Sequence, residues 1–253
     1  MMQEIVNLAC ALKNFLFYSL YKEKSKDNRA GAVDMVSKER LVQITESSID
    51  NLIERFKKTP YFFYTENDLH TYLYHEIFSR LPFEEWLCRT SDDKTSILLH
   101  KEYPTKARYV ARTPEEVRSG GARGHFDLCI WNPKETKNRL FRVVGSTDFE
   151  NEQHTFIAIE LDMIEGNKTA EQAMHHLKWD LLKLRVDTNH IEHGYSLIFV
   201  RDWQHKDKFV AEASKEASKA LNTAVLYIEK DKGTIRAGIL SSKRFLKYEP
   251  ILE

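Results

Sequence analysis

Two acidic residues lie in the middle of short segments that are otherwise apolar. Asp127 lies within HFDLCIW (125–131), and Glu160 lies within TFIAIELDM (155–163). A buried carboxylate is costly unless another group pairs with it. If adjacent strands bring these two together, their mutual repulsion demands a cation, and hard oxygen ligands suit Mg²⁺ or Mn²⁺. The pattern therefore predicts a divalent metal site, with Mg²⁺ (or Mn²⁺) as the cofactor.

The segment GHFDLCIW followed by TFIAIELDM resembles the Asp on one strand and the Glu-x-Lys on the next that define the PD-(D/E)XK nuclease superfamily. The resemblance extends over about residues 64–203. It implies an αβββαβ restriction-endonuclease-like core in which Asp127 and Glu160 hold the metal and the carbonyl of Leu161 completes one edge. It also implies a metal-dependent endonuclease that hydrolyses phosphodiester bonds, in DNA rather than RNA, of a restriction, defence or repair type.

The sequence departs from the superfamily at Asp162, because Glu-Leu-Asp stands where Glu-x-Lys is usual. The usual Lys activates the attacking water and stabilises developing charge, which an acidic residue cannot do. Three interpretations stay open. Asp162 is a third metal ligand, or a Lys reaches the site from elsewhere, or the site is inactive and the fold serves as a nucleic-acid- or protein-binding module.

The favoured substitutes for the missing Lys lie in the helix expected after the third strand, in HHLKWDLLKL. Lys178 is our first choice and Lys183 the second, since relatives in the superfamily sometimes carry the Lys on this helix, and Lys101 on the first expected strand is another candidate. The DLLKL part also resembles a helix segment of the superfamily in which Asp180 and Lys183 have a structural role.

Many relatives also place a Glu from the first core helix near the metal. At 100° per residue, Glu66 falls on the same stripe as Leu69, Leu73 and Ile77, the apolar face of its helix. We therefore prefer Glu66 as a catalytic residue and keep Glu76, at the rim of that face, in reserve. The alternative role for Glu66 is that of a first-turn acid favoured by the helix dipole.

Charge composition gives no global field for nucleic acid, because Lys plus Arg and Asp plus Glu are equal at 38 each. Phosphate contacts dominate nucleic-acid affinity, so a local surplus would have to serve instead. The stretch 101–123 is rich in basic residues. Within and beside it we expect Lys101, Arg123 and His125 to contact substrate, with a solvated loop as the alternative.

Other common chemistries find no support in the sequence. We find no P-loop, GxGxxG or GxSxG, and His75-Glu76 lacks the second His of a zinc-protease motif. Three widely spaced cysteines indicate neither a disulfide framework nor a zinc knuckle, which fits a reducing cytoplasm.

The periodicity predicts an α/β fold with a central mixed sheet flanked by helices. We expect residues 1–60 to form a helical N-terminal extension and residues 61–253 the nuclease-like domain. Helices are expected at 3–22, from Ser47 or Ser48 to Lys58, and at 66–80, 169–186 and 207–221. Strands are expected at 96–103, 125–131, 155–163, 195–200, 223–230 and 234–240.

The apolar N-terminal stretch is interrupted by polar residues and lacks a basic n-region, so we expect an amphipathic helix rather than a signal peptide or membrane span. This helix would pack on the body of the protein or on a second subunit. A homodimer is accordingly possible. We expect a cytoplasmic protein with nucleic acid as its partner and no membrane association.

Overall fold

The computed structural model describes residues 36–109, 122–139, 153–231, 234–240 and 248–251. The chain divides into two units, Met1–Asp34 and Met35–Glu253, and the description below concerns the second. Its α-helices are α2 (Lys38–Lys58), α3 (Glu66–Phe78), α4 (Ala170–Arg185) and α5 (Lys206–Ala217). Its strands are β1 (Leu87–Arg89), β2 (Thr95–Ile97), β3 (Leu99–Tyr109), β4 (Ala122–Trp131), β5 (Thr155–Glu165), β6 (His193–Arg201), β7 (Thr223–Asp231) and β8 (Thr234–Ile239).

The central sheet has six strands in the order β3-β4-β5-β6-β7-β8. The pairs β3–β4, β4–β5 and β7–β8 are antiparallel, whereas β5–β6 and β6–β7 are parallel. The parallel strands are joined by α4 and α5, the usual crossover for a parallel pair. A separate two-stranded sheet pairs β1 with β2. The expected α/β class with a mixed sheet flanked by helices is confirmed.

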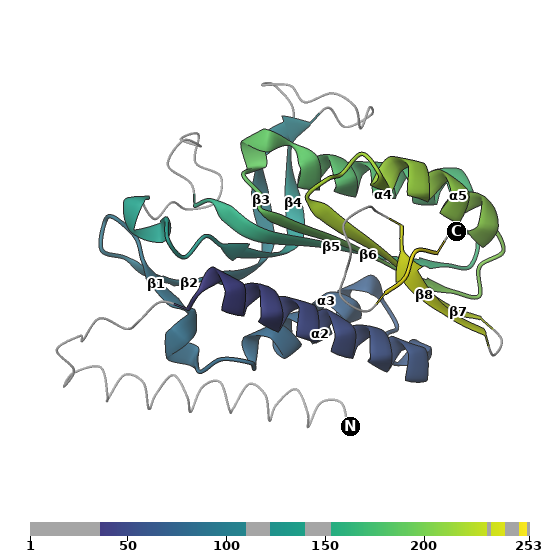
Figure 1. The fold of residues 1–253 in the computed structure, drawn as a ribbon, viewed down its shortest axis with the longest axis horizontal. Coiled ribbons are helices and arrows are strands. Elements are labelled where there is room, and N and C mark those ends of the chain that lie inside the picture. The colour runs from purple at the N-terminus through teal and green to yellow at the C-terminus, as the bar shows by residue number, and fades with distance from the viewer. Residues whose placement is uncertain (1–35, 110–121, 140–152, 232–233, 241–247, 252–253) are drawn as a thin grey trace. The chain divides into compact units, whose positions relative to one another are not determined.

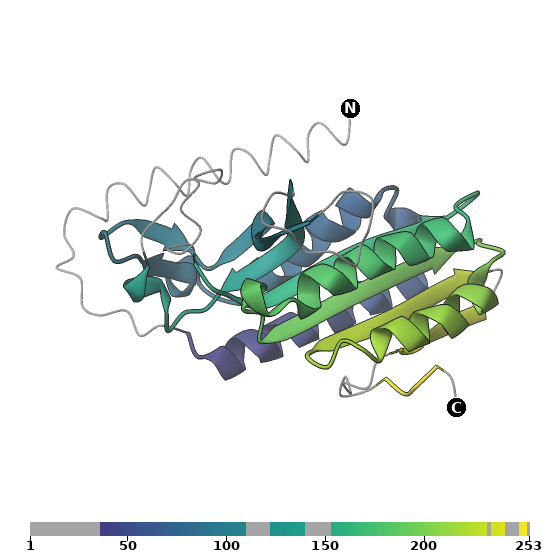
Figure 2. The same ribbon diagram turned by 90° about the horizontal axis from the view of Figure 1, so that it is seen from above.

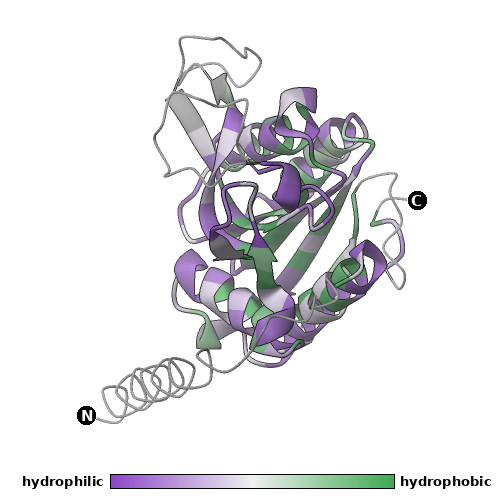
Figure 3. Ribbon diagram, turned by 90° about the vertical axis from the view of Figure 1, so that its left-hand side faces the viewer, coloured by the Kyte–Doolittle hydropathy of each residue, from purple (hydrophilic) through white to green (hydrophobic). Residues whose placement is uncertain are grey.

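Two helical layers cover the two faces of the sheet, as Figure 1 shows and Figure 2 shows from above. One apolar cluster joins α2 and α3 to one face of the sheet, and a second joins α4 and α5 to the other. In Figure 3 hydrophobic residues concentrate on the strands between the helices, while the helices alternate between polar and apolar residues. Strands covered on both faces read as continuous apolar runs, as the segment 155–163 does.

Helix α2 begins ten residues earlier than the sequence pattern indicates. Its N-cap is Ser37, whose side chain accepts a hydrogen bond from the amide of Arg40, whereas Ser48 lies buried inside the helix. The apolar residues of α2 include Leu41, Ile49 and Leu52, none of which is exposed. The buried side chains of α2 therefore belong to the same core cluster as those of α3.

The other elements lie close to their expected positions. Thr65 forms a capping box with Asp68 at the start of α3, which ends at Phe78. The largest difference concerns the expected strand 96–103. Residues 95–97 pair with β1 instead, and β3 begins at Leu99 and continues to Tyr109. The expected helix 3–22 lies outside the described residues.

No helix within the described ranges is both long and apolar enough to cross a membrane.

Candidate metal and carboxylate site

The candidate site lies where strands β4 and β5 separate. Their pairing runs from Trp131↔Thr155 to Leu128↔Ile159 and goes no further. Beyond it, the amide of Leu161 donates a hydrogen bond to Asp127 Oδ2 at 2.7 Å, and the amide of Met163 donates to Glu66 Oε2 at 3.3 Å. Two carboxylates thus replace backbone carbonyls as acceptors, because buried amides require partners. We call this point the β4–β5 fork.

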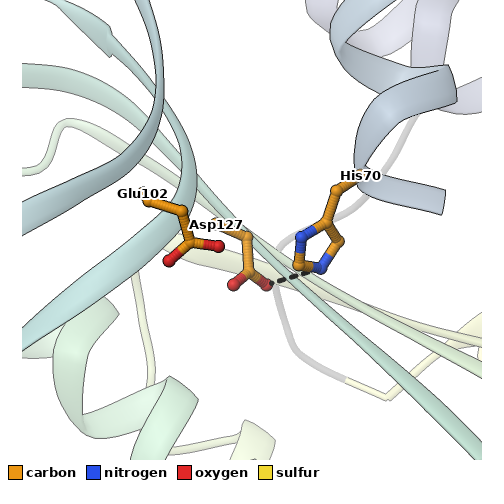
Figure 4. A group of neighbouring side chains, drawn as sticks. All are labelled: His70, Glu102 and Asp127. Carbon is orange, nitrogen blue, oxygen red and sulfur yellow. Dashed lines mark ion pairs between the residues drawn. The ribbon is translucent and has the colours of Figure 1, made fainter. Parts of the chain in front are cut away.

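Asp127 is the centre of the only His, Cys, Asp and Glu group within the described ranges whose ligand atoms converge. One ligand atom each from His70, Glu102 and Asp127 lie within 4.8 Å of one another. Figure 4 shows Asp127 between the other two side chains, with His70 Nε2 directed at Asp127 Oδ2, 3.4 Å away. The three residues come from α3, β3 and β4.

His70 is buried at 4% exposure, yet neither ring nitrogen forms a hydrogen bond to any described residue. Burial and the nearby cationic side chain of Lys101 lower the pKa of His70 to about 4. The ring is therefore neutral near pH 7, the form in which histidine binds metals. A buried imidazole whose nitrogens form no hydrogen bond, and one of which lies 3.4 Å from an oxygen of Asp127, fits a cation site better than it fits the apolar core.

Glu102 adopts a left-handed backbone conformation, with φ of 54°, inside strand β3. The register places it opposite Asp127, because Lys101 pairs with Leu128 and Tyr103 with Phe126. A non-glycine residue in this region costs about 1–2 kcal/mol. Such strain persists where the surrounding structure enforces it, and it is concentrated at functional sites. Here the local twist directs an exposed carboxylate toward Asp127.

Glu160 lies beside this group but has a different partner. It is 1% exposed, and its Oε2 accepts a hydrogen bond from Lys183 Nζ at 2.6 Å. Its Oε1 forms no hydrogen bond to a described residue. Burial raises the pKa of Glu160 well above its ordinary value, Asp127 and Asp180 raise it further, and Lys183 opposes them.

The ammonium of Lys183 is held by three oxygen atoms. Besides Glu160 it lies 3.1 Å from Asp180 Oδ1 and donates to the carbonyl of His125 at 3.1 Å. Burial alone would lower the pKa of Lys183, but Glu160, Asp180 and Asp127 raise it above its ordinary value. The side chain therefore remains charged near neutral pH. Asp180 has the electrostatic role of fixing Lys183, and its own pKa is raised by burial.

Of the two helix lysines expected from the sequence, the structure brings Lys183 to the acids and not Lys178. Lys178 is half-buried on α4, and it makes no hydrogen bond or ion pair with the described acids. The spacing explains the difference: Lys178 and Lys183 are five residues apart, which at 100° per residue directs them to opposite faces of α4. Of the two, Lys183 is therefore the lysine that the proposal below uses.

Asp162 is buried at 5% exposure and pairs with Lys168, whose Nζ lies 2.9 Å from Asp162 Oδ1. It is not a member of the converging metal group. The expected cluster of Asp127, Glu160 and Asp162 thus differs from the observed one, in which only Asp127 is shared. The reason is local, because both Glu160 and Asp162 have lysine partners of their own.

Glu66 takes the place expected for an acid from the first core helix. In addition to its bond with Met163, its Oε1 lies 3.9 Å from His70 Nε2. Burial, followed by repulsion from Asp162, raises the pKa of Glu66 to about 7. The reserve candidate Glu76 points elsewhere, since its Oε2 accepts a hydrogen bond from Asn51 Nδ2 of α2 at 3.0 Å.

The residues expected to contact substrate are placed in part. Lys101 donates a hydrogen bond to Asn67 Oδ1, and its charge acts on His70. The side chain of His125 is exposed, while its carbonyl holds Lys183. Arg123 belongs to β4, but its side chain lies outside the described part of the chain.

Comparison with protein-family models, curated proteins and solved structures returned no match. The functional argument therefore rests on the geometry of the site. That geometry combines a neutral buried histidine on α3, two convergent carboxylates on β3 and β4, and a buried pair formed by Lys183 of α4 and Glu160 of β5.

Proposed function

We propose that the chain is a metal-dependent nuclease that hydrolyses phosphodiester bonds, in DNA rather than RNA. One observation carries the proposal above the others: Lys183 places an ammonium on Glu160, 2.6 Å away, from the helix that follows β5. A positive charge at this point is what the sequence lacks at Asp162. The order α3, β3, β4, β5, α4, β6 also supports an αβββαβ core of the PD-(D/E)XK kind, with β1 and β2 inserted before β3.

In this proposal His70, Glu102 and Asp127 hold the cation. Imidazole together with carboxylates suits Mn²⁺ better than Mg²⁺, which prefers oxygen ligands alone. A bound divalent cation would supply Lewis acidity toward the phosphate and lower the pKa of a coordinated water.

The remaining residues act on the water and on the phosphate. The Oε1 of Glu160, which bonds no described residue, can orient a water, while the Lys183 ammonium on Oε2 opposes the rise in pKa that burial imposes on this carboxyl. The same ammonium stabilises negative charge that develops on the phosphate. Glu66 accepts a hydrogen bond from the Met163 amide and so fixes the β5 side of the fork.

A second function is a binding module without catalysis. The observation that favours it is that Lys183 and Lys168 are both engaged by acids, so neither ammonium is free in this state. An inactive module would bind nucleic acid or protein without cleaving it.

Cleavage of plasmid DNA with Mn²⁺ or Mg²⁺ separates the two functions. We expect the wild type to nick plasmid, and we expect Asp127→Asn and Lys183→Ala each to reduce the rate by at least about 100-fold, the usual effect of removing one charge-stabilising group. Lys178→Ala is the matched control, on the same helix and outside the site, and should cleave at the wild-type rate.

Near wild-type cleavage by Asp127→Asn would place the reaction elsewhere in the chain. A wild type that binds Mn²⁺ and DNA without cleaving would support the binding module. If Lys178→Ala lost activity while Lys183→Ala kept it, the assignment of the lysine would be reversed.

A further inference from the structure

The segment that joins α2 to α3 exposes three aromatic rings. Tyr61 is 68% exposed, Phe62 61% and Tyr64 81%. Isolated apolar residues on a surface are ordinary, but three large rings within four positions form a patch of the kind that marks a binding surface. We call Tyr61, Phe62 and Tyr64 the aromatic shelf.

The backbone under the shelf is fixed. Arg201 is buried at 6% exposure, and its guanidinium donates hydrogen bonds to the carbonyls of Pro60, Phe63 and Tyr64 at 3.2, 2.6 and 3.4 Å. Phe63, between the exposed rings, is fully buried in the main core. The rings are thus presented on a rigid support, which lowers the entropy cost of binding something flat against them.

Positive charge lies directly beside the rings. The guanidinium of Arg55, an exposed residue, lies 5.8 Å from the centroid of Phe62. That of Arg201 lies 5.3 Å from the centroid of Tyr61 but is buried and paired with Glu165, so the accessible charge here is that of Arg55. Arg55 also belongs to the last turn of α2, which carries two lysines as well, Lys57, which pairs with Glu54, and the exposed Lys58. Aromatic rings interleaved with basic side chains are the combination that binds single-stranded nucleic acid, where bases stack and phosphates pair with cations.

The shelf adjoins the acidic site along the chain. Tyr64 precedes Thr65, the N-cap of α3, and Glu66, the next residue, accepts the hydrogen bond from Met163 at the β4–β5 fork. His70 follows one helical turn later. The first two turns of α3 thus connect the shelf to the residues of the fork.

We propose that the aromatic shelf stacks unpaired bases, and that the substrate of the site is a nucleic acid with a single-stranded segment. This inference rests on the proposed nuclease function and specifies its substrate class. A duplex offers base faces only at its ends, whereas a single strand offers one at every nucleotide. The shelf consequently discriminates strandedness and not sequence, because every base has a stacking face.

The test measures binding without cleavage, using the full chain in EDTA. Fluorescence anisotropy compares a labelled oligothymidine of about 16 nucleotides, the upper range of single-strand site sizes, with a blunt hairpin duplex. We expect the wild type to prefer the single strand. Tyr64→Ala should weaken single-strand binding about tenfold, and Phe62→Ala with Tyr64→Ala by more, while duplex binding changes little.

Two variants serve as controls. Tyr64→Phe retains the ring and should bind like the wild type, which would separate stacking from loss of the hydroxyl. Leu221→Ala removes another apolar side chain, 80% exposed and far from the shelf in sequence, and should also have no effect.

Unchanged single-strand binding by the double variant would overturn the proposal. The proposal would also be overturned if sedimentation showed that the wild type is a dimer and the double variant a monomer, with no change in binding. The shelf would then be a contact between two copies of the chain. Cleavage of a tailed duplex distinguishes the two proposals. If the wild type cleaves and the shelf variants bind and cleave as the wild type does, only the proposal that the shelf stacks bases is refuted. If the wild type never cleaves but the shelf variants bind the single strand more weakly than the wild type does, only the nuclease proposal is refuted.

Discussion

The neighbours of Asp127 at the β4–β5 fork shift its pKa in opposite directions. Burial, followed by repulsion from Asp180, raises its pKa to about 7, while Lys183 and the hydrogen bond from Leu161 lower it. The carboxylate is therefore poised between its neutral and charged forms near pH 7. Because a cation favours the charged form, a bound metal and the Leu161 amide would stabilise the same state of Asp127.

Glu102 offers a direct test of whether backbone strain serves metal binding. Glycine adopts a φ of 54° without penalty, so Glu102→Gly should remove the strain of about 1–2 kcal/mol, offset in part by the roughly 0.5–1 kcal/mol entropy cost of glycine. We expect the metal-free variant to be as stable as the wild type or up to about 1.5 kcal/mol more stable, measured by urea unfolding. The same variant should lose most of the stabilisation that Mn²⁺ gives the wild type.

The control for this prediction is Glu102→Gln, which keeps the strained backbone and removes only the charge. It should show weakened metal stabilisation without the gain in metal-free stability. If Glu102→Gly destabilised the metal-free protein by more than about 1 kcal/mol, the left-handed conformation would not be a source of strain.

At the scale of elements, α2 is a structural member of the main core. Its side chains Ile49 and Leu52 are not exposed, and they pack in the same cluster as Leu73 of α3 and Phe199 of β6. Ile49→Ala should therefore lower the free energy of unfolding by about 2–5 kcal/mol, as large-to-small core changes do. Gln43→Ala, on the exposed side of the same helix, should change it by less than about 0.5 kcal/mol. Equal, small effects in denaturant unfolding would contradict a core position for α2.

The sequence predicts those elements whose signals are local. Thr65 followed by Asp68 marks the start of α3, and the apolar residues on both sides of Glu160 mark β5. The start of α2 was misjudged because Ser47 and Ser48 are equally good caps on composition, and only the packing of Leu41 selects Ser37.

The candidate site could be predicted only in part, for the same reason. Asp127 and Glu160 stand out because their neighbours in sequence are apolar. His70 does not stand out in the sequence, because it follows Leu69 on a helix whose apolar residues explain its burial. Glu102 does not either, because nothing local marks its left-handed backbone. Both are recognised only when three elements distant in sequence come together at the fork.

At the scale of the molecule, helices from opposite faces of the sheet supply the site. His70 belongs to α3, which packs on one face, and Lys183 belongs to α4, which packs on the other. Both act on Asp127, which His70 Nε2 approaches to 3.4 Å and whose pKa Lys183 lowers, at the point where the pairing of β4 with β5 ends. The proposed cation site and the Glu160–Lys183 pair would thus lie on either side of the β4–β5 fork.

The excess of acid at the fork makes the effect of metal on stability depend on pH. The pKa values of Glu66 and Asp127 are both raised to about 7, so their contribution to the stability of the metal-free protein is present below about pH 4 and is lost as pH rises through 7. At pH 8 both are charged and their repulsion is greatest, whereas at pH 6 protons occupy them and compete with a cation. His70, with a pKa of about 4, is neutral at both values and does not compete.

We therefore expect about 1 mM Mn²⁺ to raise the melting temperature more at pH 8 than at pH 6, since a ligand stabilises in proportion to the logarithm of its concentration over its dissociation constant. Asp127→Asn, which keeps the shape of the side chain and removes its charge, should abolish most of the rise at pH 8 and the difference between the two pH values. Gln43→Ala should retain both. The measurement is thermal unfolding by circular dichroism with and without metal. An increase of equal size at both pH values, or a larger one at pH 6, would show that the cation binds where Glu66 and Asp127 do not control it.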